Sequence, residues 1–133
     1  MAPNYNQDMP EITDTERRAL ESFRDLEISL EELGRLLRQR FSFDFTPSSG
    51  PYTRSLEKQT DPAEPGVPVR REHLVHAYER WKAAEVDSYH LAHWASMLVM
   101  NDDYQLDENE QELISEWLNT LSVDGVMTNP SPQ

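Results

Sequence analysis

Two stretches, ALESFRDLEISLEEL (Ala19–Leu33) and AYERWKAAEVDSYHL (Ala77–Leu91), resemble each other at an offset of 58 residues and decide the fold that we expect. The matched pairs are Ala19/Ala77, Glu21/Glu79, Phe23/Trp81, Arg24/Lys82, Glu27/Glu85, Ile28/Val86, Ser29/Asp87 and Leu33/Leu91. Each copy is typical of two helices joined by a tight turn. A duplication and one local solution reached twice both fit the pattern, and two copies are too few for a solenoid.

Capping chemistry marks where the helices begin. A capping box pairs Ser, Thr or Asp at the N-cap with Glu or Gln three residues later, so that each side chain satisfies a free backbone N–H. Three such pairs occur: Thr13/Glu16, Ser29/Glu32 and Asp107/Glu110. Asp87 is a fourth N-cap candidate. Together with the apolar periodicity, these signals predict αα-hairpins over 13–40 and 69–100 and a C-terminal helix over 107–121.

The connection over 41–68 is rich in proline and less regular. Phe41, Phe43 and Phe45 alternate with polar residues, and the turn sequence PSSGP follows, so the pattern also allows a short β-hairpin over 41–56. We therefore expect an all-α protein, a small bundle of about five helices built from two αα-hairpins and the C-terminal helix. We expect a single domain over 1–133, with frayed ends at 1–12 and 126–133.

Composition excludes several classes of protein. There is no cysteine, which rules out disulfides and zinc–thiolate sites. The N-terminal residues lack the charged and apolar regions of a signal peptide, and no apolar stretch has the length of a membrane span. We therefore expect a cytoplasmic protein.

The negative charge of the chain is concentrated near its C-terminus. The net charge is −13, and no Lys or Arg follows Lys82. The carboxylates beyond that residue are Glu85, Asp87, Asp102, Asp103, Asp107, Glu108, Glu110, Glu112, Glu116 and Asp124. Such a surplus repels nucleic acid and anionic membranes and attracts cationic surfaces. We therefore expect a basic protein as partner, with no direct contact to nucleic acid or membrane.

The run NDDYQLDENEQELISEWL over 101–118 is the candidate docking surface. It has neither the central glycine nor the alternating acids of an EF-hand loop. Acids from Asp107 onward suit a helix N-terminus, where carboxylates interact favourably with the macrodipole. Exposed tyrosines beside carboxylates are typical of protein-binding surfaces. The predicted partner-binding residues are Tyr89, Asp102, Asp103, Tyr104, Asp107, Glu108, Glu112 and Glu116.

All four histidines fall in two His-x-x-His strings, His73/His76 and His90/His93. Neighbours three apart on a helix can share a metal ion. The apolar stripes, however, place His76 and His93 on the solvent side of their helices and His73 and His90 at the margin. We therefore favour surface or boundary histidines and predict no metal or cofactor. A metal site and a pH-sensitive contact are the alternatives.

No nucleotide-binding, hydrolase or metalloprotease motif occurs, so we do not expect an enzyme. Small size and acidity resemble those of immunity proteins and antitoxins, in composition only. The leading hypothesis is an acidic inhibitor that neutralises a cationic partner such as a nuclease toxin or a nucleic-acid-binding protein. The alternatives are a helical adaptor or homodimer with no catalytic role, and a histidine-dependent metal-binding protein.

Overall fold

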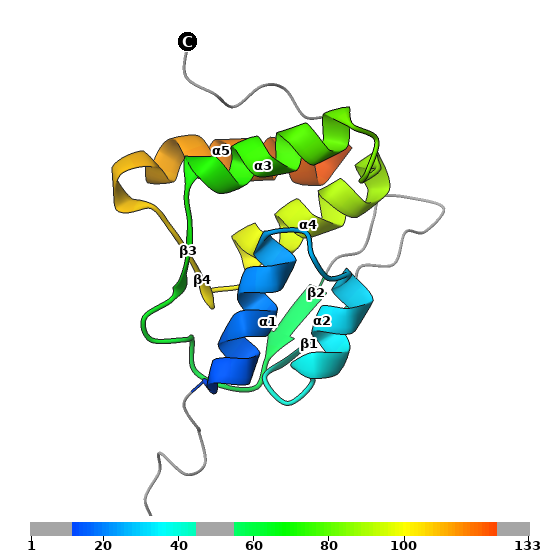
Figure 1. The fold of residues 1–133 in the computed structure, drawn as a ribbon. Coiled ribbons are helices and arrows are strands. Elements are labelled where there is room, and N and C mark those ends of the chain that lie inside the picture. Colours follow the sequence, from blue (N-terminus) through cyan, green and yellow to red (C-terminus); the bar gives the residue numbers. More distant parts are fainter. Residues whose placement is uncertain (1–11, 45–54, 125–133) are drawn as a thin grey trace, which may run out of the picture.

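The computed structural model describes residues 12–44 and 55–124. The helices are α1 (Asp14–Arg24), α2 (Leu30–Leu36), α3 (Arg71–Lys82), α4 (Ser88–Met100) and α5 (Gln111–Asp124), with the 3-10 helix η2 (Glu108–Glu110) leading into α5. The strands are β1 (Phe41–Asp44), β2 (Ser55–Lys58), β3 (Val67–Val69) and β4 (Tyr104–Leu106). Figure 1 shows these elements in chain order.

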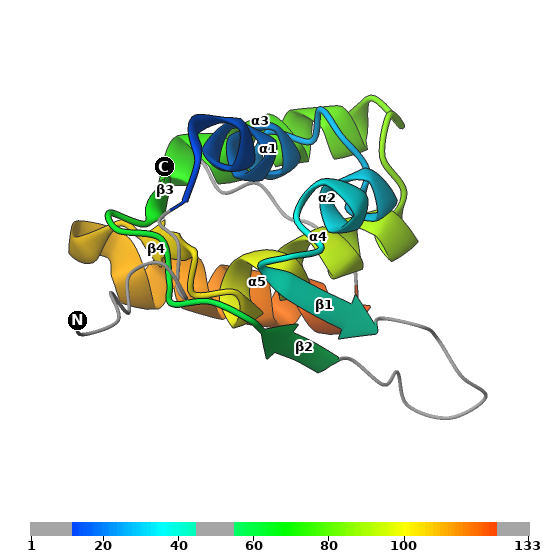
Figure 2. The ribbon, with the colours of Figure 1, turned by 90° about the horizontal axis from the view of Figure 1, so that it is seen from below.

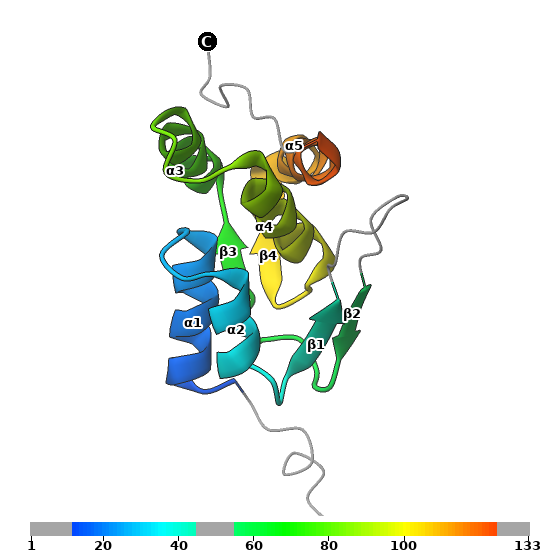
Figure 3. The same cartoon turned by 90° about the vertical axis from the view of Figure 1, so that its right-hand side faces the viewer.

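Helix α4 is the centre of the molecule. The sequence predicts an amphipathic helix here, but all residues from Leu91 to Leu98 are buried. A helix that is buried on every side must be covered by other elements all round. Figure 3 shows α4 between the α1–α2 pair, α3, α5 and the β1–β2 hairpin. Figure 2 shows that β1 and β2 lie on the side of the molecule opposite α3.

The two predicted helix pairs are present, and their turns have the same backbone geometry. Leu26 and Ala84, which are equivalent in the repeat, have positive φ angles of 62° and 60°. After each of them, the next residue donates its N–H to a carbonyl five residues back, over 2.8 and 2.9 Å respectively. This is the Schellman arrangement that closes a helix with one left-handed residue. It is unusual here because neither residue is glycine.

The predicted N-caps Thr13, Ser29 and Asp87 are confirmed, but of the three predicted capping boxes only the first forms: Glu32 bonds to Arg35 and Glu110 to Arg71 instead. Thr13 and Glu16 form a reciprocal capping box, with bonds of 2.9 and 3.0 Å. The Ser29 side chain accepts a hydrogen bond from the backbone N–H of the residue three positions later over 3.0 Å, and the Asp87 side chain does the same over 2.8 Å. Both helices that follow a repeat turn therefore start at the predicted residue.

The prediction of an all-α fold is wrong: the chain is a small mixed α/β protein. β1 and β2 pair antiparallel, with Phe41 opposite Lys58 and Asp44 opposite Ser55, so the hairpin is wider than the predicted 41–56. β3 and β4 pair in parallel. Three-residue strands are too short to show a period, and Pro68 in the middle of β3 argues against a strand.

Several predicted features fall outside the described residues. These are Phe45, the PSSGP turn, and the ends 1–12 and 126–133, except Ile12, which packs against the core. The C-terminal helix begins as η2 directly after Asp107 and runs as α5 to Asp124, three residues beyond the predicted end.

Close backbone approach supports the β3–β4 pairing. A Cβ added to Gly66 would lie 2.8 Å from the Cβ of Gln105 and 3.4 Å from the carbonyl oxygen of Asp103. Neither atom is the end of a flexible side chain, so a methyl group at this position requires the two strands to separate.

We therefore expect Gly66→Ala to destabilise the protein by roughly 1–3 kcal/mol, as overpacking does. Urea unfolding followed by circular dichroism measures this. Gly34→Ala is the control, since its added Cβ would meet only the end of the Phe43 ring, at 2.8 Å, and that ring can turn. An unchanged midpoint for Gly66→Ala would contradict the close approach of β3 and β4.

Candidate functional site

The acidic run divides into an internal part and an external part, and Asp103 belongs to the interior. Its side chain has no exposed surface. Oδ1 accepts hydrogen bonds from Arg40 Nη2 at 3.0 Å and from the backbone N–H of Ala63 at 2.8 Å, and Oδ2 lies 2.7 Å from Lys58 Nζ. The Arg40 side chain is itself 3% exposed. This is a buried ion pair with additional hydrogen bonds.

Lys58 extends this cluster to the turn after α4. Its ammonium group donates to Asn101 Oδ1 at 2.8 Å and lies 3.0 Å from Asp102 Oδ1. Asn101 Oδ1 also accepts the backbone N–H of Asp103 at 2.9 Å. We call Arg40, Lys58, Asn101 and Asp103 the Asp103 cluster. Asp102 stays 61% exposed at its edge.

The cluster determines the protonation of Asp103. Burial alone would raise the pKa of this carboxyl group. The hydrogen bonds from Lys58, Ala63 and Arg40 and the positive charge of Lys58 outweigh burial and lower the pKa below its ordinary value. Asp103 is therefore ionised in the folded protein at neutral pH.

Tyr104 is also buried, with 5% of its surface exposed, and its hydroxyl donates to the Leu20 carbonyl at 2.7 Å. Burial raises the pKa of this phenol well above its ordinary value. The expectation that Asp103 and Tyr104 face a partner is therefore wrong. The reason is the β3–β4 pairing, which draws the residues after α4 into the core.

Tyr89 and Asp102, both among the predicted partner-binding residues, do not lie in one patch. Tyr89 lies in the first turn of α4, and Asp102 follows its last turn. The helix between them is roughly 20 Å long at 1.5 Å per residue. Tyr89 is 45% exposed and packs edge-on against His93, with ring centroids 4.5 Å apart.

The remaining predicted acids lie at the start of α5. Glu108 lies in η2, and Glu112 and Glu116 lie four residues apart on one side of α5; all three are exposed. We call them the α5 acidic face. Within the described ranges, no Lys, Arg or His nitrogen lies within 4 Å of their carboxylates. Together with Leu113, they line a shallow hollow.

The other acids nearby have structural partners. Asp107 caps η2, with its side chain 3.5 Å from the backbone nitrogen of Asn109. Glu110 forms an ion pair with Arg71 at the start of α3. These two carboxylates stabilise the starts of helices and contribute less to the external field than the α5 acidic face.

The histidines have separate roles. His73 Nδ1 accepts the backbone N–H of Arg70 at 2.9 Å, and His90 Nδ1 lies 2.7 Å from Asp87 Oδ1. His76 is exposed. His93 is 4% exposed, so its predicted place on the solvent side is wrong; α4 is covered on that side as well. In the part of the chain that the structure describes, no three His, Asp or Glu side chains are placed to hold a metal ion.

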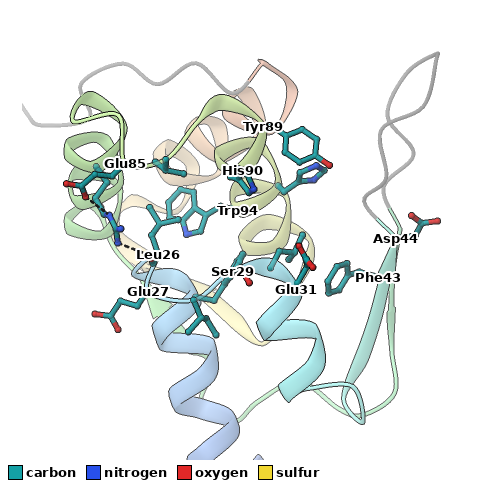
Figure 4. A pocket seen from close by; sticks show the side chains of 16 residues that line it. Leu26, Glu27, Ser29, Glu31, Phe43, Asp44, Glu85, Tyr89, His90 and Trp94 are labelled. Carbon is teal, nitrogen blue, oxygen red and sulfur yellow. Dashed lines mark hydrogen bonds and ion pairs between the residues drawn. The ribbon is translucent and has the colours of Figure 1, made fainter.

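A pocket of about 480 Å³ lies between the two repeat turns, and we call it the turn pocket. Figure 4 shows Trp94 at its centre, Leu26 beside it, Tyr89 and His90 on the α4 side, and Phe43 on the strand side. The other lining residues are Phe23, Glu27, Ile28, Ser29, Leu30, Glu31, Asp44, Arg80, Glu85, Val86 and His93.

Hydrogen bonds join the two halves of the turn pocket. Arg80 Nη1 donates to the carbonyl of Leu26 at 2.7 Å, and Arg80 Nε donates to Glu85 Oε1 at 3.1 Å. On the other side, Trp94 Nε1 donates to the carbonyl of Arg24 at 3.1 Å. Both helices of the second hairpin thus bond to the end of α1 or to the turn that follows it, so the pocket walls are held in place by the fold itself.

Sequence reasoning found the two turns but not the pocket between them. Ile28 and Val86 are a matched pair of the repeat, each directly before a predicted N-cap. Both also line the turn pocket. The repeat was the available signal, since equivalent turns on paired hairpins can face each other. The contribution of Phe43 depends on where β1 packs, which no local pattern indicates.

Comparison with known proteins gives no relative: no family model, no curated protein and no solved structure matches this chain. Within the described ranges, no helix combines the length and the hydropathy that crossing a bilayer requires.

The Asp103 cluster predicts acid sensitivity. A carboxyl group whose folded pKa is lowered contributes stability above its unfolded pKa of about 4, and this contribution is lost as the pH falls toward the folded pKa. We expect Asp103→Asn to destabilise by about 3–5 kcal/mol at pH 7, because Arg40 and Lys58 lose their buried counter-charge.

Chemical unfolding between about pH 2.5 and 7 tests this, and Asp103→Asn should flatten the acid limb of the stability profile. Asp102→Asn is the matched control. It removes one exposed carboxylate bound to the same lysine and should cost less than about 1 kcal/mol. Equal losses for the two variants would contradict a buried role for Asp103.

His73 predicts a second pH dependence, near neutrality. Burial first, and then the charge of Arg24, lower the pKa of His73. The unfolded chain therefore takes up a proton near pH 6.5 while the folded protein stays neutral, so stability falls as the pH drops below about 6.5. Protonation also removes the Nδ1 acceptor for the N–H of Arg70.

Unfolding curves between about pH 5 and 8 should show this slope, and His73→Gln should reduce it. The exposed His76→Gln variant is the control and should retain the slope of the parent. A parent profile that is flat across this range would contradict the assignment.

Proposed function

We propose that this chain is a binding protein that neutralises a cationic protein partner, as acidic inhibitors of the immunity-protein and antitoxin class do. In this proposal it acts by occupying the partner and not by catalysis. The observation that carries the proposal is the α5 acidic face: three exposed carboxylates around one hollow at the start of α5, with no cationic nitrogen within 4 Å of them among the described residues.

The geometry of the α5 acidic face supports an external role for its charge. Like charges four residues apart on a helix destabilise it by a few tenths of a kcal/mol per pair. An arrangement that costs stability is consistent with a function outside the fold. Carboxylates held together on a rigid helix raise the encounter rate with a cationic surface, and salt weakens this effect.

The docking surface in this proposal contains fewer carboxylates than the acidic C-terminal part of the chain. Of the acids beyond Lys82, Asp103 is internal, and four more have cationic or histidine partners within the chain: Glu85, Asp87, Asp102 and Glu110. We therefore place the first encounter with a basic partner at the start of α5.

The test is the association rate with the partner retained by the immobilised chain from its own cells at about 50 mM salt. We expect Glu108→Gln, Glu112→Gln and Glu116→Gln together to slow association several-fold, with little change in the dissociation rate, as loss of steering charge does. The control is Glu57→Gln, Asp61→Asn and Glu64→Gln, which removes the same charge from exposed positions on the connection.

The proposal also requires that the partner be basic, that its own activity be lost at one-to-one stoichiometry, and that the complex weaken as salt rises. A salt-resistant homodimer with no basic partner would overturn it in favour of the self-association alternative. Val123, 74% exposed on α5, is the apolar side chain that such a homodimer would cover.

A further inference from the structure

The turn pocket has an apolar interior that plays no part in the docking role proposed for the α5 acidic face. Its interior is apolar: Phe23 and Trp94 are buried, and Leu26, Ile28 and Val86 pack partly against the core around them. An apolar concavity of about 480 Å³ lies within the range of about 300–1,000 Å³ that binds drug-sized ligands. It can enclose one or two large side chains and is too small for a folded domain.

The rim of the turn pocket is acidic. Glu27, Glu31, Asp44 and Glu85 are all exposed and come from both repeat turns, the first turn of α2 and the end of β1. Figure 4 shows Glu27 and Glu85 on one side of the apolar side chains and Glu31 on the other, while Asp44 points outward from the strand. A ligand in the pocket would therefore meet negative charge from more than one direction.

The one guanidinium in the lining offsets only one of these carboxylates, that of Glu85. Arg80 is committed to the Glu85 carboxylate and to the carbonyl of Leu26. As far as the described ranges extend, no cationic nitrogen lies within 4 Å of Glu27 or Glu31. The carboxylates of Glu27 and Glu31 thus leave an excess of negative charge at the rim, which repels an anionic ligand.

We propose that the turn pocket receives a large apolar side chain from a cationic peptide segment of the partner, with neighbouring Lys or Arg side chains on the acidic rim. This inference rests on the proposed function, because it names the part of the cationic partner that is held. Charge complementarity selects the segment, and burial of its apolar side chain slows dissociation.

The rigidity of the walls makes the pocket suitable for this role. The bonds from Arg80 to Leu26 and from Trp94 to Arg24 hold the two turns at a fixed separation. A pocket that is already formed avoids the entropic cost of ordering loops on binding. The α5 acidic face would then act on the association rate and the turn pocket on the dissociation rate.

The experiment uses the full chain and three synthetic peptides. The first has a central tryptophan flanked by alanines and then by two lysines on each side, the second replaces tryptophan by alanine, and the third replaces the lysines by glutamates. At about 50 mM salt, we expect the first peptide to bind at least about tenfold more tightly than either of the others.

Variants of the chain locate this binding. Val86→Trp fills the pocket and should abolish the preference for the tryptophan peptide. Ile28→Trp, at the equivalent position of the other turn, is a second filling variant in case the first does not fold. Glu27→Gln with Glu31→Gln should raise the dissociation rate about fivefold or more. Glu57→Gln with Asp61→Asn, the matched control of equal charge change at exposed positions outside both acidic regions, should leave it within about twofold.

The outcomes separate this inference from the proposed function. If the two lysine peptides bind equally well and folded filling variants change nothing, the pocket inference is overturned while cationic binding stands. If no lysine peptide binds at low salt, the pocket inference and the proposed function are both overturned. Binding of free tryptamine as tightly as the tryptophan peptide, or a dimer that Val86→Trp dissociates, would assign the pocket to a small amine or to a second copy and would also overturn the inference.

Discussion

The buried carboxylate of Asp103 is the interaction on which the arrangement of this protein most depends. It joins the end of the α2 segment, through Arg40, to strand β2, through Lys58, and to the connection, through the N–H of Ala63. A lone charge in the interior would cost several kcal/mol, so none of these partners can be removed without leaving another group uncompensated. A cluster of this kind favours one packing over its alternatives, because a misplaced strand would leave a buried charge unpaired.

The cluster also connects the fold to the turn pocket. Lys58 pairs with Phe41 in the β-hairpin, and two residues along β1 lies Phe43, which forms one wall of the pocket. The ring of Phe43 rests where Gly34 of α2 has no side chain, since a Cβ there would approach the ring to 2.8 Å. The position of this wall therefore follows from the ion pairs at one end of the hairpin and from a glycine on the neighbouring helix. In physical terms, a buried electrostatic constraint determines the shape of an apolar site.

How much of this could be predicted from the sequence depends on the range of each interaction. The caps at Thr13, Ser29 and Asp87 form bonds three residues away, so local patterns suffice. The pairing of β3 with β4 joins residues 37 positions apart, as Val67 with Tyr104, and leaves no local signal. The same long sequence separation explains why Asp103 and Tyr104 were wrongly predicted to face a partner. A count of carboxylates describes net charge, but whether a carboxylate faces water or a buried arginine depends on long-range packing. Within the proposed sites, Glu112 and Glu116 could be predicted to lie together because residues four apart share one side of a helix. The 3-10 start at Glu108 and the turn pocket could not be predicted in this way.

The two acidic regions lie at opposite ends of the central helices, and this separation bears on how they could act. Figure 1 shows the start of α5 on one side of the molecule and the turn between α3 and α4 on the other. The helix α5 has 14 residues, which corresponds to roughly 20 Å. The Debye length at physiological ionic strength is about 8 Å, so charge on the α5 acidic face contributes little to the field at the turn pocket. A partner that interacts with both regions must therefore be long enough to contact the α5 acidic face and the turn pocket at once, or must contact them one after the other. In either case, substitutions in the two regions share no contacts, and their effects on the binding free energy should add.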